Sequence, residues 1–133
     1  MKQFTSKPLL VRYGETDQMG VVHHSNYLRY FEVARLEWLS ALGVSYASME
    51  KEGLIMPVID IKATYKTPAL FDDSLTIYVF LSELPRVKII FLYEIKNQKD
   101  EIVCTGETTL AFLNAKTRKP VRCPEEFGGL FST

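Results

Sequence analysis

The fold is decided by residues 13–43, which read YGETDQMGVVHHSNYLRYFEVARLEWLSALG. The first part contains too many polar residues and glycines to continue a strand, so Gly14 to Ser25 is expected to be a loop. From Tyr27 onward the apolar side chains recur at helical spacing. They form one stripe, made of Tyr27, Tyr30, Phe31, Ala34, Trp38, Ala41 and Leu42. The pattern predicts one amphipathic helix of about four turns.

The residues beside this stripe mark both ends of the helix. Ser25 or Asn26 can cap the exposed amides at its start, and Gly43 stands where a left-handed residue closes a helix. Arg29, Glu32 and Arg35 lie off the apolar stripe.

The rest of the chain has the spacing of β-strands. A short apolar run at 9–13 precedes the loop, and a shorter helical segment at 45–52 follows the long helix. After Gly53 the period falls to two, with Ile59, Ile61, Ala63 and Tyr65 on one face. Runs at 75–81, 87–95 and 102–113 repeat the strand signal between turn segments. One long helix and several antiparallel strands predict a single α+β domain over residues 1–133.

The two middle strands suggest self-association. Residues 75–81 and 87–95 carry apolar side chains on both faces, for example Ile77 beside Tyr78 and Phe91 beside Leu92. One helix covers only one face of a sheet. We therefore expect a homodimer or homotetramer to bury the remaining apolar surface.

The composition excludes several classes of partner. Sixteen Lys and Arg balance sixteen Asp and Glu, so no global charge attracts nucleic acid or an anionic membrane. No segment has the length and apolarity of a membrane span, and no secretion signal is evident, which favours a cytoplasmic protein. The two cysteines, Cys104 and Cys123, sit in no metal or redox motif and are expected to be reduced. No cofactor is indicated.

The loop before the helix is the best candidate for chemistry. A helix N-terminus presents unpaired amides and a partial positive charge, which polarise a carbonyl oxygen and stabilise an oxyanion. Asp17 in this loop could attack a substrate or activate water. The competing interpretation is that its carboxylate only bonds nearby backbone, as Asp often does in turns.

The loop also resembles a known family signature, carried by Tyr13-x-Glu15-Thr16-Asp17-x-Met19-Gly20-Val21-Val22-x-His24-x-Asn26-Tyr27. It is similar to the YbgC and 4-hydroxybenzoyl-CoA thioesterase branch of the hotdog superfamily, and the similarity extends to about Phe112. The resemblance implies an antiparallel sheet wrapped around one long helix, dimers whose sheets run on into each other, and often tetramers. The implied reaction is hydrolysis of an acyl-CoA to free acid and CoA.

The resemblance also assigns roles to residues. Asp17 would be the catalytic carboxylate, as nucleophile or as general base. The backbone amide of His24 would polarise the thioester carbonyl, its side chain could bond substrate or orient water, and Gly20 would let the loop approach closely. The family often has an aromatic residue in place of His23, so no role is assigned there.

The same resemblance places CoA contacts elsewhere in the chain. Met56, Pro57 and Val58 would contact the acyl-pantetheine arm through their backbone, and Arg86 and Lys88 would hold phosphate. A second basic group would meet the nucleotide end; it consists of Lys116, Arg118, Lys119 and Arg122. Surface solubility is the alternative role for both basic groups.

Four other interpretations compete with this one. Adjacent His23 and His24 invite a metal site, but neighbouring side chains usually point apart and three or four ligands are needed, so no metal is expected. The substrate carrier could be acyl carrier protein instead of CoA. The domain could also bind acyl thioesters without hydrolysing them. A hotdog dehydratase is disfavoured, because its acid lies on the long helix whereas Asp17 precedes the helix.

Overall fold

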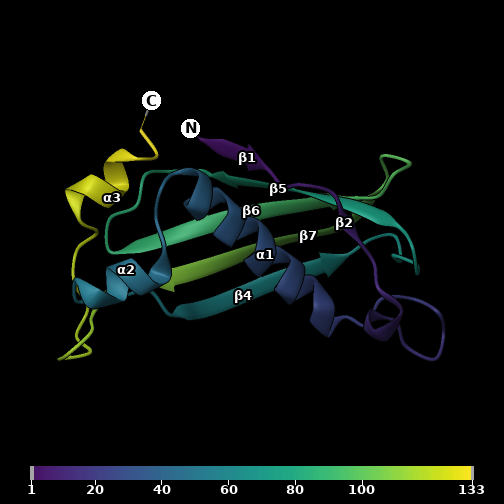
Figure 1. The fold of residues 1–133 in the computed structure, drawn as a ribbon, viewed down its shortest axis with the longest axis horizontal. Coiled ribbons are helices and arrows are strands. Elements are labelled where there is room, and N and C mark those ends of the chain that lie inside the picture. The colour runs from purple at the N-terminus through teal and green to yellow at the C-terminus, as the bar shows by residue number, and fades with distance from the viewer. Residues whose placement is uncertain (1, 133) are drawn as a thin grey trace.

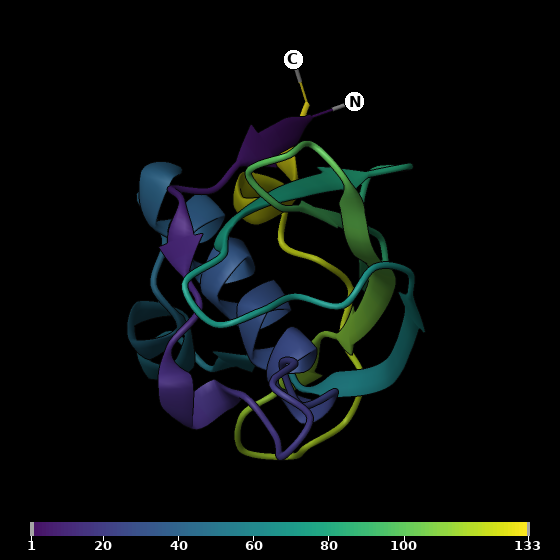
Figure 2. The ribbon, with the colours of Figure 1, turned by 90° about the vertical axis from the view of Figure 1, so that its right-hand side faces the viewer.

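A curved antiparallel sheet wraps around one long helix, α1 (Ser25–Ala41), in the computed structural model, which describes residues 2–132 (Figure 2). The six-stranded sheet has the order β1-β5-β6-β7-β4, and β2 pairs with the start of β5. Its strands are β1 (Gln3–Thr5), β2 (Leu9–Leu10), β4 (Val58–Tyr65), β5 (Ser74–Leu81), β6 (Lys88–Lys96) and β7 (Ile102–Ala111). The expected α+β hotdog fold is confirmed.

Smaller elements close the ends of the sheet (Figure 1). They are a 3₁₀ turn η1 (Tyr13–Glu15), the helices α2 (Tyr46–Lys51) and α3 (Glu125–Gly129), and a two-stranded sheet of β3 (Leu54–Ile55) with β8 (Leu113–Asn114). None of the helices within residues 2–132 combines the length and apolarity that a bilayer crossing requires.

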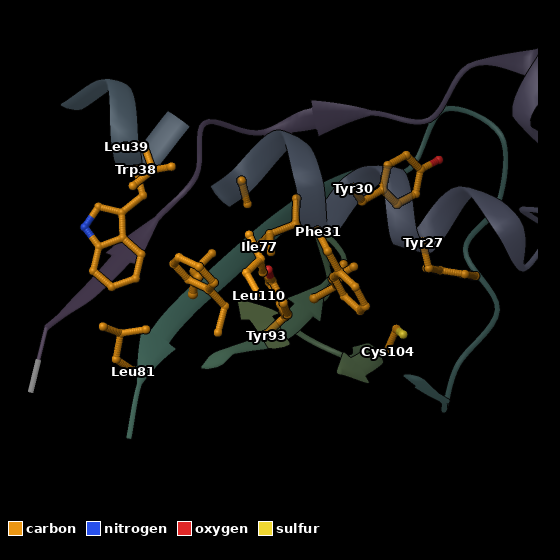
Figure 3. Packing of buried hydrophobic residues seen from close by; sticks show 14 of the residues in the cluster. Tyr27, Tyr30, Phe31, Trp38, Leu39, Ile77, Leu81, Tyr93, Cys104 and Leu110 are labelled. Carbon is orange, nitrogen blue, oxygen red and sulfur yellow. The ribbon is translucent and has the colours of Figure 1, made fainter. Parts of the chain in front are cut away.

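The apolar stripe of α1 is buried as expected. Tyr27, Tyr30, Phe31, Ala34 and Trp38 are all at most 4% exposed, whereas the predicted Ala41 lies at the surface. Figure 3 shows the stripe directed onto the strands, with Phe31 above Tyr93. The helix closes as predicted at Gly43, whose φ is +82°, and the Val44 amide donates to the Leu39 carbonyl in a Schellman motif.

Arg35 departs from the expected surface pattern of α1. Although it lies off the apolar stripe, it is only 5% exposed. Its guanidinium donates to the Tyr46 hydroxyl and to the Tyr93 hydroxyl, each at 3.1 Å, and the Tyr93 and Thr108 hydroxyls lie 2.6 Å apart. These neutral oxygens compensate part of the cost of burying the charge. Arg35 thus joins α1 to α2 and to the sheet.

Two strands near the N-terminus differ from the expectation. The apolar run at 9–13 pairs only through Leu9 and Leu10, because the chain turns into η1 at Tyr13. The strand β1 was not anticipated. Its Phe4 turns inward and stacks on Trp38 with ring centroids 6.2 Å apart.

The alternation in β5 and β6 buries every second residue against α1. Their outward residues Tyr78, Phe80, Ile90 and Leu92 are half-buried even in one chain. More exposed apolar side chains lie instead on the edge strand β4, whose sole ladder partner among the described strands is β7. Four of its side chains are 40–51% exposed: Val58, Ile59, Ile61 and Tyr65. A bulge between Val58 and Asp60 breaks the strict alternation predicted there.

The contact that sets the height of α1 above the sheet is made by Phe31. Its ring stacks on Tyr93, with centroids 4.3 Å apart and planes 16° from parallel. The same ring lies directly over Gly106 in β7, where a Cβ atom would collide with it and would also lie 2.9 Å from the Lys62 carbonyl oxygen. A glycine is therefore required at this point of closest approach.

We predict that Gly106→Ala destabilises the protein by about 1–3 kcal/mol, because the added methyl overpacks the contact between α1 and β7. Urea unfolding followed by circular dichroism measures the change. Gly129→Ala is the matched control, since a Cβ at that position would meet no atom within 4 Å beyond its chain neighbours and the backbone of its own helix. Equal stabilities of the two variants would contradict the proposed close contact.

Candidate active site

The loop before α1 is a small hairpin. Thr16 pairs with Val22, the Asp17 amide donates to the Val21 carbonyl at 2.8 Å, and the Gly20 amide donates to the Asp17 carbonyl at 3.0 Å. Gly20 has a φ of +80°, a conformation that glycine adopts without strain and that closes the turn. The hairpin therefore carries Asp17 on one arm, and its other arm leads into α1.

Only one of the two carboxylate oxygens of Asp17 has a hydrogen-bond partner among the described residues. Its Oδ1 accepts the Met19 amide at 2.8 Å, which is the turn-stabilising bond expected of an Asp in such a loop. Its Oδ2 has no hydrogen-bond or ion-pair partner within residues 2–132, and the residue is partly exposed. The turn bond fixes the side chain and leaves Oδ2 free to meet another group.

The sequence predicts that Ser25 or Asn26 caps the start of α1, but in the structure neither side chain does so. The His23 Nδ1 accepts the Ser25 amide at 3.2 Å and lies 2.8 Å from the Ser25 hydroxyl. The Asn26 side chain turns away to the Glu15 carbonyl. His23, for which the sequence suggested no role, therefore performs the capping.

The His24 amide is left open by this arrangement. The next three amides donate to His23 Nδ1, the His23 carbonyl and the His24 carbonyl, respectively. No acceptor among the described residues takes the His24 N–H itself. A free amide at a helix N-terminus can bind a carbonyl oxygen or an anion.

The two histidine rings stack, contrary to the expectation that they point apart. Their centroids are 4.1 Å apart, and the exposed His24 ring also meets the edge of Tyr65 in β4 at 6.5 Å. The start of α1 therefore borders the end of the edge strand β4. Within residues 2–132 no group of three or more His, Cys, Asp or Glu side chains is arranged to hold a metal ion.

Glu15 connects the loop to α1, a role that the signature residues alone did not indicate. Its carboxylate accepts the Tyr30 hydroxyl and the Arg12 amide, each at 2.9 Å, and forms a 3.0 Å ion pair with the Arg12 guanidinium. Burial pushes the pKa of Glu15 upward, but the hydrogen bonds and charge of Arg12 and the bond from Tyr30 outweigh it and hold the pKa below its usual value. The group is ionised at neutral pH.

The residues expected to contact CoA lie at the other end of the sheet (Figure 1). Met56 packs against the core, the Pro57 carbonyl accepts the Ala111 amide, and Lys88 pairs with Ala111 in the neighbouring strand. Val58 begins β4 and is 40% exposed. The structure thus brings Met56, Pro57, Val58 and Lys88 together at one end.

Arg86 shares a surface pocket with Arg122, a member of the second basic group. The pocket has a volume of about 600 Å³ and lies between the β5–β6 loop and α3. Arg86 and Arg122 both line it, together with the carboxylate residue Glu125. In the sequence Arg86 and Arg122 belong to separate basic groups. The Cys123 amide donates a hydrogen bond to the Arg86 carbonyl, and this bond brings the two segments together.

Within one chain the two groups of candidate residues are separated. The hairpin contacts the segment before β5, through Val21 and Leu70, and this segment lies beside the far end of β6. The nine-residue β6 spans roughly 26 Å from Lys88 to that end. Asp17, Gly20 and His24 therefore lie at one end of the sheet, whereas Arg86 and Lys88 lie at the other.

The cysteines do not offer an alternative nucleophile. Burial raises the pKa of both Cys104 and Cys123 to about 11. Both thiols are therefore protonated at neutral pH, and the thiolate is the reactive form.

Known proteins resemble this chain over nearly its whole length. The sequence profile of the thioesterase-like superfamily matches residues 11–131. The acyl-CoA thioesterase YbgC of Helicobacter pylori is 33% identical over 130 residues, which cover 92% of this chain and 96% of that protein. YneP of Bacillus subtilis is 32% identical over 123 residues, covering 92% and 89%.

A solved structure agrees with the observed fold. A DHNA-CoA thioesterase from Staphylococcus aureus superposes with a TM-score of 0.91 at 37% sequence identity, covering 99% of this chain and 90% of that one. The arrangement of α1 and the sheet is thus shared with an enzyme that acts on a thioester.

Proposed function

This chain belongs to the thioesterase-like superfamily and is a thioester hydrolase, and we propose that it cleaves an acyl-CoA to a free acid and CoA through Asp17. One observation carries the proposal. The unengaged oxygen of Asp17 and the unpaired amide of His24 lie on the two arms of one hairpin at the start of α1.

The His24 amide would bind the thioester carbonyl oxygen. Its N–H, together with the positive end of α1, polarises the carbonyl and stabilises the negative charge that develops when the carbon is attacked. The His23 cap supports this role, because it satisfies the Ser25 amide and holds the first turn in place while His24 remains free.

Asp17 would bring about the attack on the thioester carbon in one of two ways. As a nucleophile, Oδ2 bonds to the thioester carbon, the C–S bond breaks, CoA leaves as a thiolate that takes a proton, and water hydrolyses the resulting anhydride. As a general base, Asp17 takes a proton from water while the water oxygen bonds to the carbon and CoA leaves in the same manner. Both routes need the same position for the carboxylate.

A homodimer through β4 would complete the site. Antiparallel pairing of two β4 edges brings the Val58 end of one copy beside the Tyr65 end of the other, and Tyr65 lies against His24 and Tyr27. Met56 to Val58 of the second copy would then approach the hairpin of the first. The exposed apolar side chains of β4 support this pairing, because an uncovered apolar edge strand is prone to pair with another strand.

The CoA phosphates would then reach the basic end of the second copy. Arg86 and Arg122 line one pocket there, and Lys88 lies at the neighbouring strand start. Guanidinium groups bind phosphate through charge-assisted hydrogen bonds.

We predict that Asp17→Asn retains the fold and thioester binding but lowers kcat by about 10²-fold or more, because Asn keeps the turn bond yet can neither attack nor take a proton. Release of free thiol from a panel of aromatic and aliphatic acyl-CoAs measures the rate, and acyl-phosphopantetheine on carrier protein is assayed alongside.

Met19→Ala is a control for the hairpin, since it retains the backbone amide that bonds to Asp17 and removes a side chain that is 85% exposed. A near wild-type rate for Asp17→Asn would show that Asp17 is only a turn residue. If the wild type binds these thioesters and releases thiol from none, the domain is a binding module.

We also predict that replacing both Arg86 and Lys88 by Ala raises KM for acyl-CoA about tenfold or more, because two phosphate contacts are lost. Hydrolysis of a short acyl-pantetheine thioester should be nearly unchanged. The control removes two other exposed cations, Lys7 and Lys99, so that the net charge is matched. Equal losses with both substrates would argue against phosphate binding at Arg86 and Lys88.

A further inference from the structure

We propose that Glu15 is a positioning residue that sets the separation between the Asp17 carboxylate and the His24 amide. The inference rests on the proposed function of these two groups. In this proposal Glu15 contacts neither the substrate nor the reacting atoms. It acts through two sets of hydrogen bonds, one made by its carboxylate and one made by its backbone carbonyl.

The carboxylate holds the hairpin to the second turn of α1. Tyr30 is 2% exposed and directs its hydroxyl away from Phe31 and Tyr93, as Figure 3 shows, to donate to Glu15 Oε1 at 2.9 Å. The Glu15 side chain is itself only 13% exposed. A hydrogen bond between a buried hydroxyl and a carboxylate is stronger than a neutral one, so it restrains the loop firmly.

The backbone carbonyl of the same residue holds the start of α1. It accepts the His23 amide and the Asn26 side-chain amide, both at 2.9 Å. Asn26 is 8% exposed, so this second bond is also shielded from water. Glu15 is therefore tied to α1 at two places, one in the first turn and one a turn further along.

Because of the hairpin geometry, these hydrogen bonds fix the distance between the Asp17 carboxylate and the His24 amide. Asp17 follows Glu15 by two residues on one arm, and His24 follows its bonded partner His23 by one residue on the other. Each group is thus separated from a Glu15 bond by at most two residues. An attacking oxygen and an oxyanion donor must both meet one carbonyl, and a misplacement of about 1 Å can cost 10²-fold in rate.

Arg12 provides a matched contrast. Its guanidinium also bonds to the Glu15 carboxylate, at 3.0 Å, but its side chain is 81% exposed and belongs to the loop side. A solvent-exposed ion pair contributes little. The position of α1 relative to the loop should therefore depend on Tyr30 and not on the Arg12 side chain.

The test compares Tyr30→Phe, Glu15→Gln, Glu15→Ala and Arg12→Ala in the full-length protein, with acyl-CoA as substrate. Tyr30→Phe and Glu15→Ala should lower kcat about tenfold or more while KM changes little. Glu15→Gln retains an acceptor for Tyr30 and should recover most of the rate. Arg12→Ala should keep the wild-type rate.

Amide hydrogen exchange gives a readout that does not depend on activity. In Tyr30→Phe the amides of Asp17, Gly20 and His23, all bonded within the hairpin or to Glu15, should exchange faster, whereas the amides of β6 should be unchanged. Unaltered hairpin exchange together with an unaltered kcat for Tyr30→Phe would overturn the proposal, even if its melting temperature falls.

Asp17→Asn separates the failure of this inference from failure of the proposed function. If Asp17→Asn is inactive while Tyr30→Phe and Glu15→Ala turn over at the wild-type rate, Asp17 is catalytic and Glu15 does not position it. If Glu15→Ala does not fold, the Tyr30→Phe result alone decides the question, because that variant removes a single hydroxyl.

Discussion

The stacking of Phe31 over Gly106 and Tyr93 is the contact on which the rest of the molecule depends. It brings α1 as close to the sheet as a side chain allows, because the residue beneath the ring has no Cβ. With the helix fixed there, its N-terminus emerges beside the end of β4, where Tyr65 meets His24. The hairpin before the helix is then tied back to it through Glu15. Core packing thus determines where the open His24 amide lies.

The same packing leaves apolar surface uncovered on a single chain. Helix α1 covers the inner face of β5 and β6 more completely than that of β4, where four apolar side chains remain 40–51% exposed. The hairpin residues and the basic residues lie at opposite ends of the sheet, separated by the length of β6. Antiparallel pairing of two β4 strands would resolve both problems, since it covers the apolar strand and unites opposite ends of two copies.

Periodicity predicted α1 and the four long strands, because burial of one face is a local property of each segment. The signature also predicted the family, which the comparisons confirm. The remaining features depend on contacts between distant segments. The burial of Arg35 needs hydroxyls from Tyr46 and Tyr93. The capping role of His23 depends on how the hairpin closes. Arg86 meets Arg122 only through the hydrogen bond from the Cys123 backbone amide. No spacing in the sequence encodes these partners.

Activity of a mixed dimer tests most directly whether two chains share one site. Asp17→Asn and Arg86→Ala/Lys88→Ala chains, carrying different affinity tags, are co-expressed and the heterodimer is isolated through both tags. If each site takes Asp17 from one copy and the cations from the other, one of the two sites is intact, and the rate at low substrate should be about half that of the wild type. If each chain carries its own complete site, the heterodimer will be no faster than the average of the two parent proteins, and the shared site is contradicted.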